Sequence, residues 1–115
     1  MSDKKIDEVR TPTEEDTWEA LTEAGIIPRA GNSTEYATGS WRVERPIWSA
    51  EKCINCYQCW IMCPDASIQL DAEGKVAGID YDHCKGCGVC FSVCPPKVAA
   101  IEMILESDAM AKEGK

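Results

Sequence analysis

Apolar residues are gathered in short segments in the second half of the chain, and these segments predict strands. Residues 68–70 and 75–79 are mostly apolar and flank the segment Asp71-Ala72-Glu73-Gly74, a pattern that predicts a β-hairpin with a four-residue turn. Residues 46–48 and 101–104 also have the composition of short strands. We therefore expect short strands in this part of an α+β fold.

The first half carries the start signal of one helix. Thr11 has the side chain of an N-cap and Pro12 suits the first helical position, so the pattern predicts a short helix over roughly residues 12–24. Trp18 and Leu21 would share one face of it. Because an isolated helix of this length is marginal in water, we expect that face to pack against something. The alternative is a disordered segment, which its acidity favours.

The position of the cysteines divides the chain into three parts. All eight cysteines lie between Cys53 and Cys94. We expect an N-terminal arm over residues 1–46, a cysteine module over residues 47–104 and a C-terminal tail over residues 105–115.

Charge and composition narrow the class of protein. The 115 residues include 12 Lys and Arg against 20 Asp and Glu, a formal net charge of −8. Nucleic acid is therefore not an expected partner, because binding to phosphates needs a basic surface. One Phe, four Trp and three Tyr are few for a self-sufficient core, so the small domain needs metal or covalent cross-links.

The ends of the chain favour a reducing compartment. Residues 1–8 contain no apolar segment of a secretory signal, and neither end carries a lipidation motif. The longest uninterrupted apolar run, residues 59–63, is far shorter than the roughly 20 residues that cross a bilayer. We expect a cytoplasmic protein with no membrane partner, in which closely spaced cysteines bind metal.

The cysteines form an internal repeat. Each copy has the spacing C-x2-C-x2-C-x3-C followed by Pro, which is typical of iron–sulfur ligation. The second copy is displaced from the first by 31 positions: Cys53, Cys56, Cys59 and Cys63 recur as Cys84, Cys87, Cys90 and Cys94.

This spacing predicts two [4Fe–4S] clusters that share their ligands across the repeat. Three cysteines in one tight loop can hold three corners of a cubane. The fourth follows about one helical turn later, roughly 5 Å along the axis, and is expected to bind the other cluster. The predicted ligand sets are Cys53, Cys56, Cys59 and Cys94 for cluster I, and Cys84, Cys87, Cys90 and Cys63 for cluster II.

Other readings of the cysteines and their neighbours are weaker. Structural zinc more often uses separated C-x2-C pairs, and disulfides do not suit the expected compartment. The chain shows no nucleophile–base pair, phosphate loop or dinucleotide motif, so no catalytic residue is expected. His83 is interpreted as a solvated loop residue. Lys52, Lys85 and Lys97 flank the ligand loops and either offset cluster charge or contact an acidic partner.

The module resembles bacterial two-cluster ferredoxins, and the chain from about Trp18 onward resembles a particular family. The sequences Gly31-Asn32-Ser33, Thr38-Gly39-Ser40-Trp41-Arg42 and Arg45-Pro46, leading into Cys53, are similar to the delta subunits of 2-oxoacid:ferredoxin oxidoreductases of the pyruvate synthase type. The resemblance implies a bacterial two-cluster ferredoxin fold behind an extended arm.

The resemblance also implies a function. The chain would be the electron-transfer subunit of a complex that oxidatively decarboxylates a 2-oxoacid, with thiamine diphosphate, magnesium and coenzyme A on partner subunits and ferredoxin as an external acceptor. The arm would lie on neighbouring subunits and bury Trp18, Tyr36 and Trp41, so removing residues 1–46 would abolish assembly and leave the clusters intact. The alternatives are a free, diffusible ferredoxin and a metal-binding module without redox function.

Overall fold

A computed structural model of the chain describes residues 11–113. The first ten residues of the expected arm and the last two of the expected tail lie outside the described residues. The chain divides into two compact units, with the boundary between Tyr36 and Ala37. The second unit therefore begins ten residues before the expected module.

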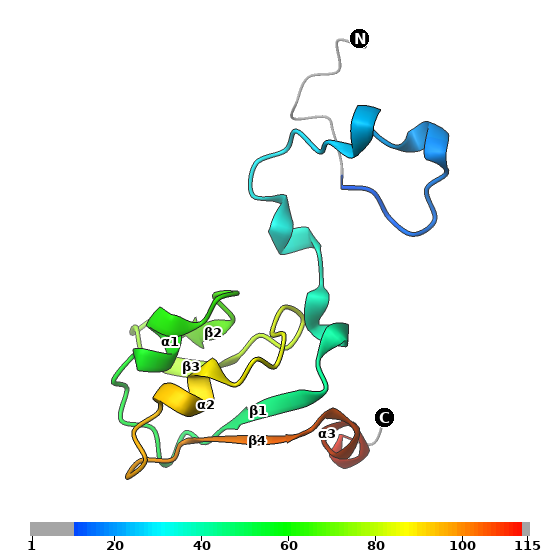
Figure 1. The fold of residues 1–115 in the computed structure, drawn as a ribbon. Helices are drawn as coiled ribbons and strands as arrows, with labels where there is room; N and C mark the ends of the chain where they lie inside the picture. Colours follow the sequence, from blue (N-terminus) through cyan, green and yellow to red (C-terminus); the bar gives the residue numbers. More distant parts are fainter. Residues whose placement is uncertain (1–10, 114–115) are drawn as a thin grey trace. The chain divides into compact units, whose positions relative to one another are not determined.

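The longest strands of the second unit join its two ends. Strand β1 (Glu44–Trp48) pairs antiparallel with β4 (Ile101–Leu105), so that Trp48 lies opposite Ile101 (Figure 1). A proline can occupy β1 because a two-stranded sheet leaves one side of each strand without a hydrogen-bonded neighbour. The sequence indicates both strands but not their pairing, which spans more than fifty residues.

The predicted hairpin is confirmed. Strand β2 (Ile68–Leu70) pairs antiparallel with β3 (Val76–Ile79). The Asp71 carboxylate closes the turn by accepting hydrogen bonds from the backbone N–H groups of Glu73 and Lys75, both at 2.9 Å. This is the local hydrogen bonding that makes aspartate a common turn residue.

Two one-turn helices connect the cysteines of each repeat. Helix α1 (Gln58–Met62) and helix α2 (Val89–Val93) pack against each other near the hairpin (Figure 1). Cys63 and Cys94 are their C-caps. Around them the buried apolar core is small, and two of its five residues are ligand candidates: it consists of Cys59, Ile68, Val76, Cys90 and Ile101.

The expected tail contains a third helix. Helix α3 (Glu106–Lys112) begins directly after β4. It lies at the end of the β1–β4 pair where β1 begins and β4 ends (Figure 1). Its first residue, Glu106, binds Arg42 and Arg45, each through two hydrogen bonds of 2.7–3.0 Å. The C-terminal segment is therefore attached to the residues that lead into β1.

The helix predicted over residues 12–24 is wrong as a single helix. Two 3₁₀ helices, Trp18–Ala20 and Glu23–Gly25, stand in its place, followed by two more at Asn32–Glu35 and Thr38–Trp41. The Thr11 hydroxyl, predicted as the N-cap, donates to the Glu35 carboxylate. Trp18 is 79% exposed, so no tertiary packing supports the cooperative helix that the capping signals favour.

The described residues form no helix with the length and apolar character needed to cross a bilayer.

Candidate metal centres

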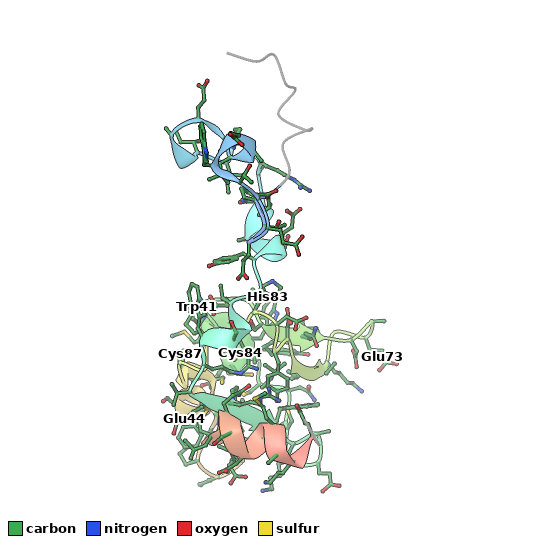
Figure 2. The ribbon with its side chains drawn as sticks, turned by 90° about the vertical axis from the view of Figure 1, so that its right-hand side faces the viewer. Trp41, Glu44, Glu73, His83, Cys84 and Cys87 are labelled. Carbon is green, nitrogen blue, oxygen red and sulfur yellow. The ribbon has the colours of Figure 1, made fainter. Side chains whose placement is uncertain are left out.

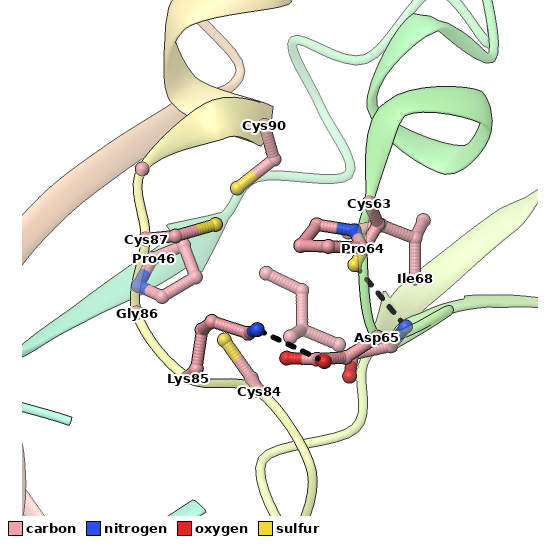
Figure 3. Close-up of a pocket in the computed structure, with 13 residues that line it drawn as sticks. Pro46, Cys63, Pro64, Asp65, Ile68, Cys84, Lys85, Gly86, Cys87 and Cys90 are labelled. Carbon is pink, nitrogen blue, oxygen red and sulfur yellow. Dashed lines mark hydrogen bonds and ion pairs between the residues drawn. The ribbon is translucent and has the colours of Figure 1, made fainter. Parts of the chain in front are cut away.

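The second cysteine loop and the end of α1 enclose one cavity. Cys84, Cys87 and Cys90 line it together with Cys63, which comes from the first repeat (Figure 3). The cavity has an empty volume of about 340 Å³, part of which is open to solvent. We refer to it as cavity II, because its four cysteines are those predicted for cluster II.

A second cavity repeats this arrangement with the copies exchanged. Cys53, Cys56 and Cys59 line it together with Cys94, and its empty volume of about 330 Å³ is close to that of the first. We refer to it as cavity I. The structure thus brings together the same two groups of four cysteines that the sequence groups.

The two loops share one backbone conformation. Asn55 and Tyr57 have φ of 56° and 63°, and the equivalent Gly86 and Gly88 have φ of 72° and 77°. This left-handed conformation turns the chain tightly enough for three cysteines to face one cavity. Glycine adopts it readily, whereas the first loop holds a tyrosine and an asparagine there by side-chain hydrogen bonds.

Those hydrogen bonds come from the hairpin, which covers cavity I. The Tyr57 hydroxyl donates to the Gly74 carbonyl at 2.6 Å, and the Val76 N–H donates to the Asn55 side-chain oxygen at 2.9 Å. Since residues 74–76 form the end of the turn and the start of β3, the hairpin fixes the first cysteine loop.

A different segment covers the loop of cavity II. Arg42 donates to the carbonyls of Tyr81 and Cys84, the latter at 3.0 Å, and the Thr38 hydroxyl donates to the His83 carbonyl at 3.3 Å. Figure 2 shows Cys84 and Cys87 beside the chain that runs from Trp41 to Glu44. The segment that carries the family resemblance therefore packs against a ligand loop, which the sequence does not indicate.

Both cavities suit the chemistry of an iron–sulfur cluster. Their linings are mostly apolar, and in each a backbone N–H donates to a cysteine sulfur: Asn55 N–H to Cys53 at 3.4 Å and Ser67 N–H to Cys63 at 3.3 Å. The Ser67 hydroxyl in cavity II and the Trp48 indole N–H in cavity I are buried donors without a partner in the described chain. A bound sulfide or thiolate would accept from them, which satisfies groups that are costly to bury alone.

Burial also sets the state of the thiols. It raises the pKa of Cys90 to about 11 and raises the pKa of Cys59 and Cys84 above the ordinary thiol value. These three thiols therefore keep their protons at neutral pH when no metal is bound, and binding of a metal group must release those protons. Among the described residues, no three His, Cys, Asp or Glu side chains converge closely enough to hold a single metal ion.

Three kinds of residue near the cysteine loops remain to be placed: the single histidine, the lysines and the apolar side chains around the cavities. His83 pairs through Nδ1 with Asp80 at 2.7 Å, so it is not the merely solvated residue expected. Lys85 pairs with Asp65 at 3.4 Å in the lining of cavity II (Figure 3). Ile54 and Val98 line cavity I, although Ile54 is also largely exposed.

Comparison with known proteins identifies the cysteine module. A family model described as a 4Fe-4S dicluster domain matches residues 47–103. This range includes both cysteine loops, both one-turn helices and the hairpin, and hence the lining of both cavities except Pro46.

The similarity to whole proteins extends beyond that module. The pyruvate synthase subunit PorD of Thermotoga maritima is 46% identical over 98 residues, which cover 85% of this chain and 96% of the relative. PorD of Methanocaldococcus jannaschii is 48% identical over 86 residues, covering 75% and 96%. The ketoisovalerate oxidoreductase subunit VorD of Pyrococcus furiosus is 49% identical over 56 residues, covering 49% and 52%. Because only 69 residues follow residue 46, the alignment with the Thermotoga protein includes at least 29 residues of the arm.

Proposed function

The chain belongs to the family of delta subunits of the 2-oxoacid:ferredoxin oxidoreductases, and from this premise we propose how its residues serve electron transfer. It is a non-catalytic electron-transfer subunit that carries two [4Fe–4S] clusters within a complex with catalytic subunits. The observation that supports the assignment of residues is the pair of similar cavities, each lined by four cysteines drawn from both repeats.

The proposed ligands are those four cysteines of each cavity. Cys53, Cys56, Cys59 and Cys94 hold cluster I in cavity I, and Cys84, Cys87, Cys90 and Cys63 hold cluster II in cavity II. When bound, each cluster accepts and releases one electron. The chain itself supplies deprotonated thiolates, the backbone N–H groups of Asn55 and Ser67, and apolar side chains that limit the access of water.

The described part of the arm is proposed to bind neighbouring subunits. Trp18, Ile26 and Tyr36 are exposed in the N-terminal unit, and Trp41 is exposed at the start of the second unit. Large apolar side chains gathered in a short segment are typical of surfaces that bind a protein partner. We propose that assembly of the complex buries them.

The remaining chemistry is assigned to other chains. Thiamine diphosphate, magnesium and coenzyme A are proposed to bind to the catalytic subunits, since neither cavity here offers a site for them. The external acceptor is proposed to be ferredoxin. We also propose a cytoplasmic location without a membrane partner, where a reducing environment keeps all eight cysteines available as ligands.

Purification under anaerobic conditions tests the function. Tagged chain expressed in its native cell should co-purify in fixed ratio with larger subunits, one of which holds thiamine diphosphate, and should contain two [4Fe–4S] clusters by iron and sulfide analysis. A brown 12.7 kDa protein that elutes alone would contradict the subunit assignment in favour of a diffusible ferredoxin. A colourless protein loaded with zinc would contradict the clusters themselves.

A further inference from the structure

The two cysteine loops are equivalent in their backbone, with left-handed residues at the same two positions and a one-turn helix after each. Each cavity has one backbone N–H···S bond, from Asn55 to Cys53 in cavity I and from Ser67 to Cys63 in cavity II. Each cavity also has one buried donor without a partner in the described chain, Trp48 or Ser67. These contributions act in the same direction on both clusters, so they leave little difference between them.

A buried cation breaks the equivalence. The side chain of Arg42 is only 5% exposed, and its Nη1 donates to the carbonyl of Cys84, a cysteine of cavity II. None of the described residues that line cavity I is charged. Since the interaction of a charge with its surroundings grows as water is excluded, a buried guanidinium on a ligand residue acts strongly on the cluster that this residue holds.

Nearby charges do not cancel this effect at cavity II. Arg42 directs Nη1 to the Cys84 carbonyl and Nε and Nη2 to the Glu106 carboxylate, so its positive charge lies between that carbonyl and the carboxylate. The second carboxylate, Glu113, binds Arg45 at 2.6 Å and therefore offsets Arg45, the other arginine bound to Glu106. The positive charge of Lys85 is neutralised by the Asp65 carboxylate, with which it forms an ion pair.

The covering segments explain why, among residues 11–113, a buried arginine bonds to a cysteine carbonyl at cavity II and not at cavity I. Residues 74–76 of the hairpin cover the first loop with backbone groups, whereas residues 38–44 cover the second loop. A methyl group on Gly86 would overlap the Glu44 carbonyl, so this covering is a close fit. Arg42 is held in place by its two bonds to Glu106.

We propose that Arg42 gives the cluster in cavity II a higher reduction potential than the cluster in cavity I, so that an electron entering the subunit rests on cluster II. This inference rests on the proposed ligand sets. Arg42 acts through the Cys84 carbonyl and not on the transferred electron directly, so it is a positioning residue. A positive charge stabilises the reduced cluster, which is the more negative of the two states.

The distribution of one electron between the clusters measures the effect. In the full-length protein carrying both clusters and reduced by one electron, the cysteine β-proton NMR signals report the reduced fraction of each cluster separately. We expect cluster II to hold the electron about tenfold more often than cluster I, a ratio that corresponds to about 59 mV for a one-electron couple. Arg42→Gln should bring the ratio close to one.

Two further variants separate the charge of Arg42 from its structural role. Arg42→Lys keeps the charge but cannot bind Glu106 in the same two-pronged way, so its ratio should lie between those of the wild type and Arg42→Gln. Arg45→Gln is the matched control, because Arg45 also binds Glu106 and packs on Tyr81 but, within residues 11–113, makes no hydrogen bond to the second cysteine loop. Its ratio should change less than roughly threefold.

The outcomes are distinct. Equal reduction of both clusters in the wild type, preference for cluster I, or an equal effect of Arg45→Gln and Arg42→Gln would each overturn the proposal. If Arg42→Gln fails to load clusters, the proposal is still tested by two measurements. These are the ratio of reduced cluster II to reduced cluster I in the wild type and the same ratio in Arg42→Lys. Two other results would contradict the ligand sets and hence the proposed function. One is a protein that does not contain two clusters, and the other is β-proton signals of Cys63 that change together with those of Cys53 on reduction, since that would place both residues on one cluster.

Discussion

At the scale of the residue, Gly86 shows how a close fit restricts the sequence. Its φ is +72°, and an added Cβ would overlap the Glu44 carbonyl and the Arg42 Cβ. We expect Gly86→Ala to destabilise the protein by about 3 kcal/mol, combining left-handed strain with overpacking. Thermal unfolding and iron content of the purified protein measure the loss.

Gly74→Ala is the matched control for Gly86→Ala. Gly74 has φ of +81° but no atom within 4 Å of the added Cβ, so only the conformational cost of about 1–2 kcal/mol is expected. Equal effects of the two variants would show that Glu44 and Arg42 do not pack against Gly86 as described.

The pKa of Glu106 makes a second prediction at this scale. Hydrogen bonds from Arg42 and then from Arg45 lower its pKa to about 2, and its side chain is 19% exposed. Because the folded pKa lies below the unfolded value of about 4.3, the stabilisation is complete above pH 5 and is lost as pH falls through the folded value. Glu106→Gln should cost about 2–3 kcal/mol at pH 7.

Thermal unfolding of wild type and Glu106→Gln at matched pH values tests this sign. The difference in Tm should be constant between pH 7 and 5 and should shrink toward pH 3. A difference that stays the same or grows as the pH falls would show that the Glu106 carboxylate is not held ionised by the two arginines.

At the scale of the element, α1 and α2 determine how the cysteines are shared. Each carries the third cysteine of one cavity as its second residue, and its C-cap cysteine lines the other cavity. We expect Cys63→Ser to remove or degrade cluster II alone, lowering the iron content by about half, because a serine hydroxyl is a poor iron ligand. Iron analysis and the remaining cysteine β-proton signals identify the cluster that survives.

Cys94→Ser should have the reciprocal effect: cluster I should be lost and cluster II retained. If Cys63→Ser instead removed the signals of Cys53, Cys56 and Cys59, ligation would run within each repeat, and the shared arrangement of the two cavities would be wrong.

The elements differ in how far the sequence predicts them. The hairpin of β2 and β3 is predicted because its signals are local: two apolar segments and an aspartate turn. The helix expected over residues 12–24 fails because capping residues stabilise a helix only when its apolar face is buried, and Trp18 has no such contact. Helix α3 is missed because its attachment depends on Arg42 and Arg45, which are about sixty residues away.

At the scale of the whole molecule, the position of the unit boundary changes the truncation that the sequence suggests. Residues 37–46 contribute Arg42, Arg45 and the start of β1 to the cluster-bearing unit. Removing residues 1–36 is therefore expected to preserve the full iron and sulfide content and to abolish co-purification with the larger subunits. Removing residues 1–46 should lose the clusters as well.

Iron content and co-purifying polypeptides of the two truncated proteins test this division of roles. Clusters retained after removal of residues 1–46 would show that the segment from Thr38 to Pro46 is dispensable for folding. Normal assembly after removal of residues 1–36 would contradict the proposed role of the exposed Trp18 and Tyr36 in subunit contacts.

The sequence by itself determined the cofactor and the family, and it predicted the grouping of the eight cysteines that line the two cavities. These follow from covalent spacing, because ligands two or three residues apart can only be arranged in a few ways around a cubane. Only the tertiary structure decided that Arg42 lies on the Cys84 carbonyl and that the two cavities are covered by different segments. Such contacts join residues far apart in the chain, and the free energy that selects them comes from packing, which local spacing does not encode.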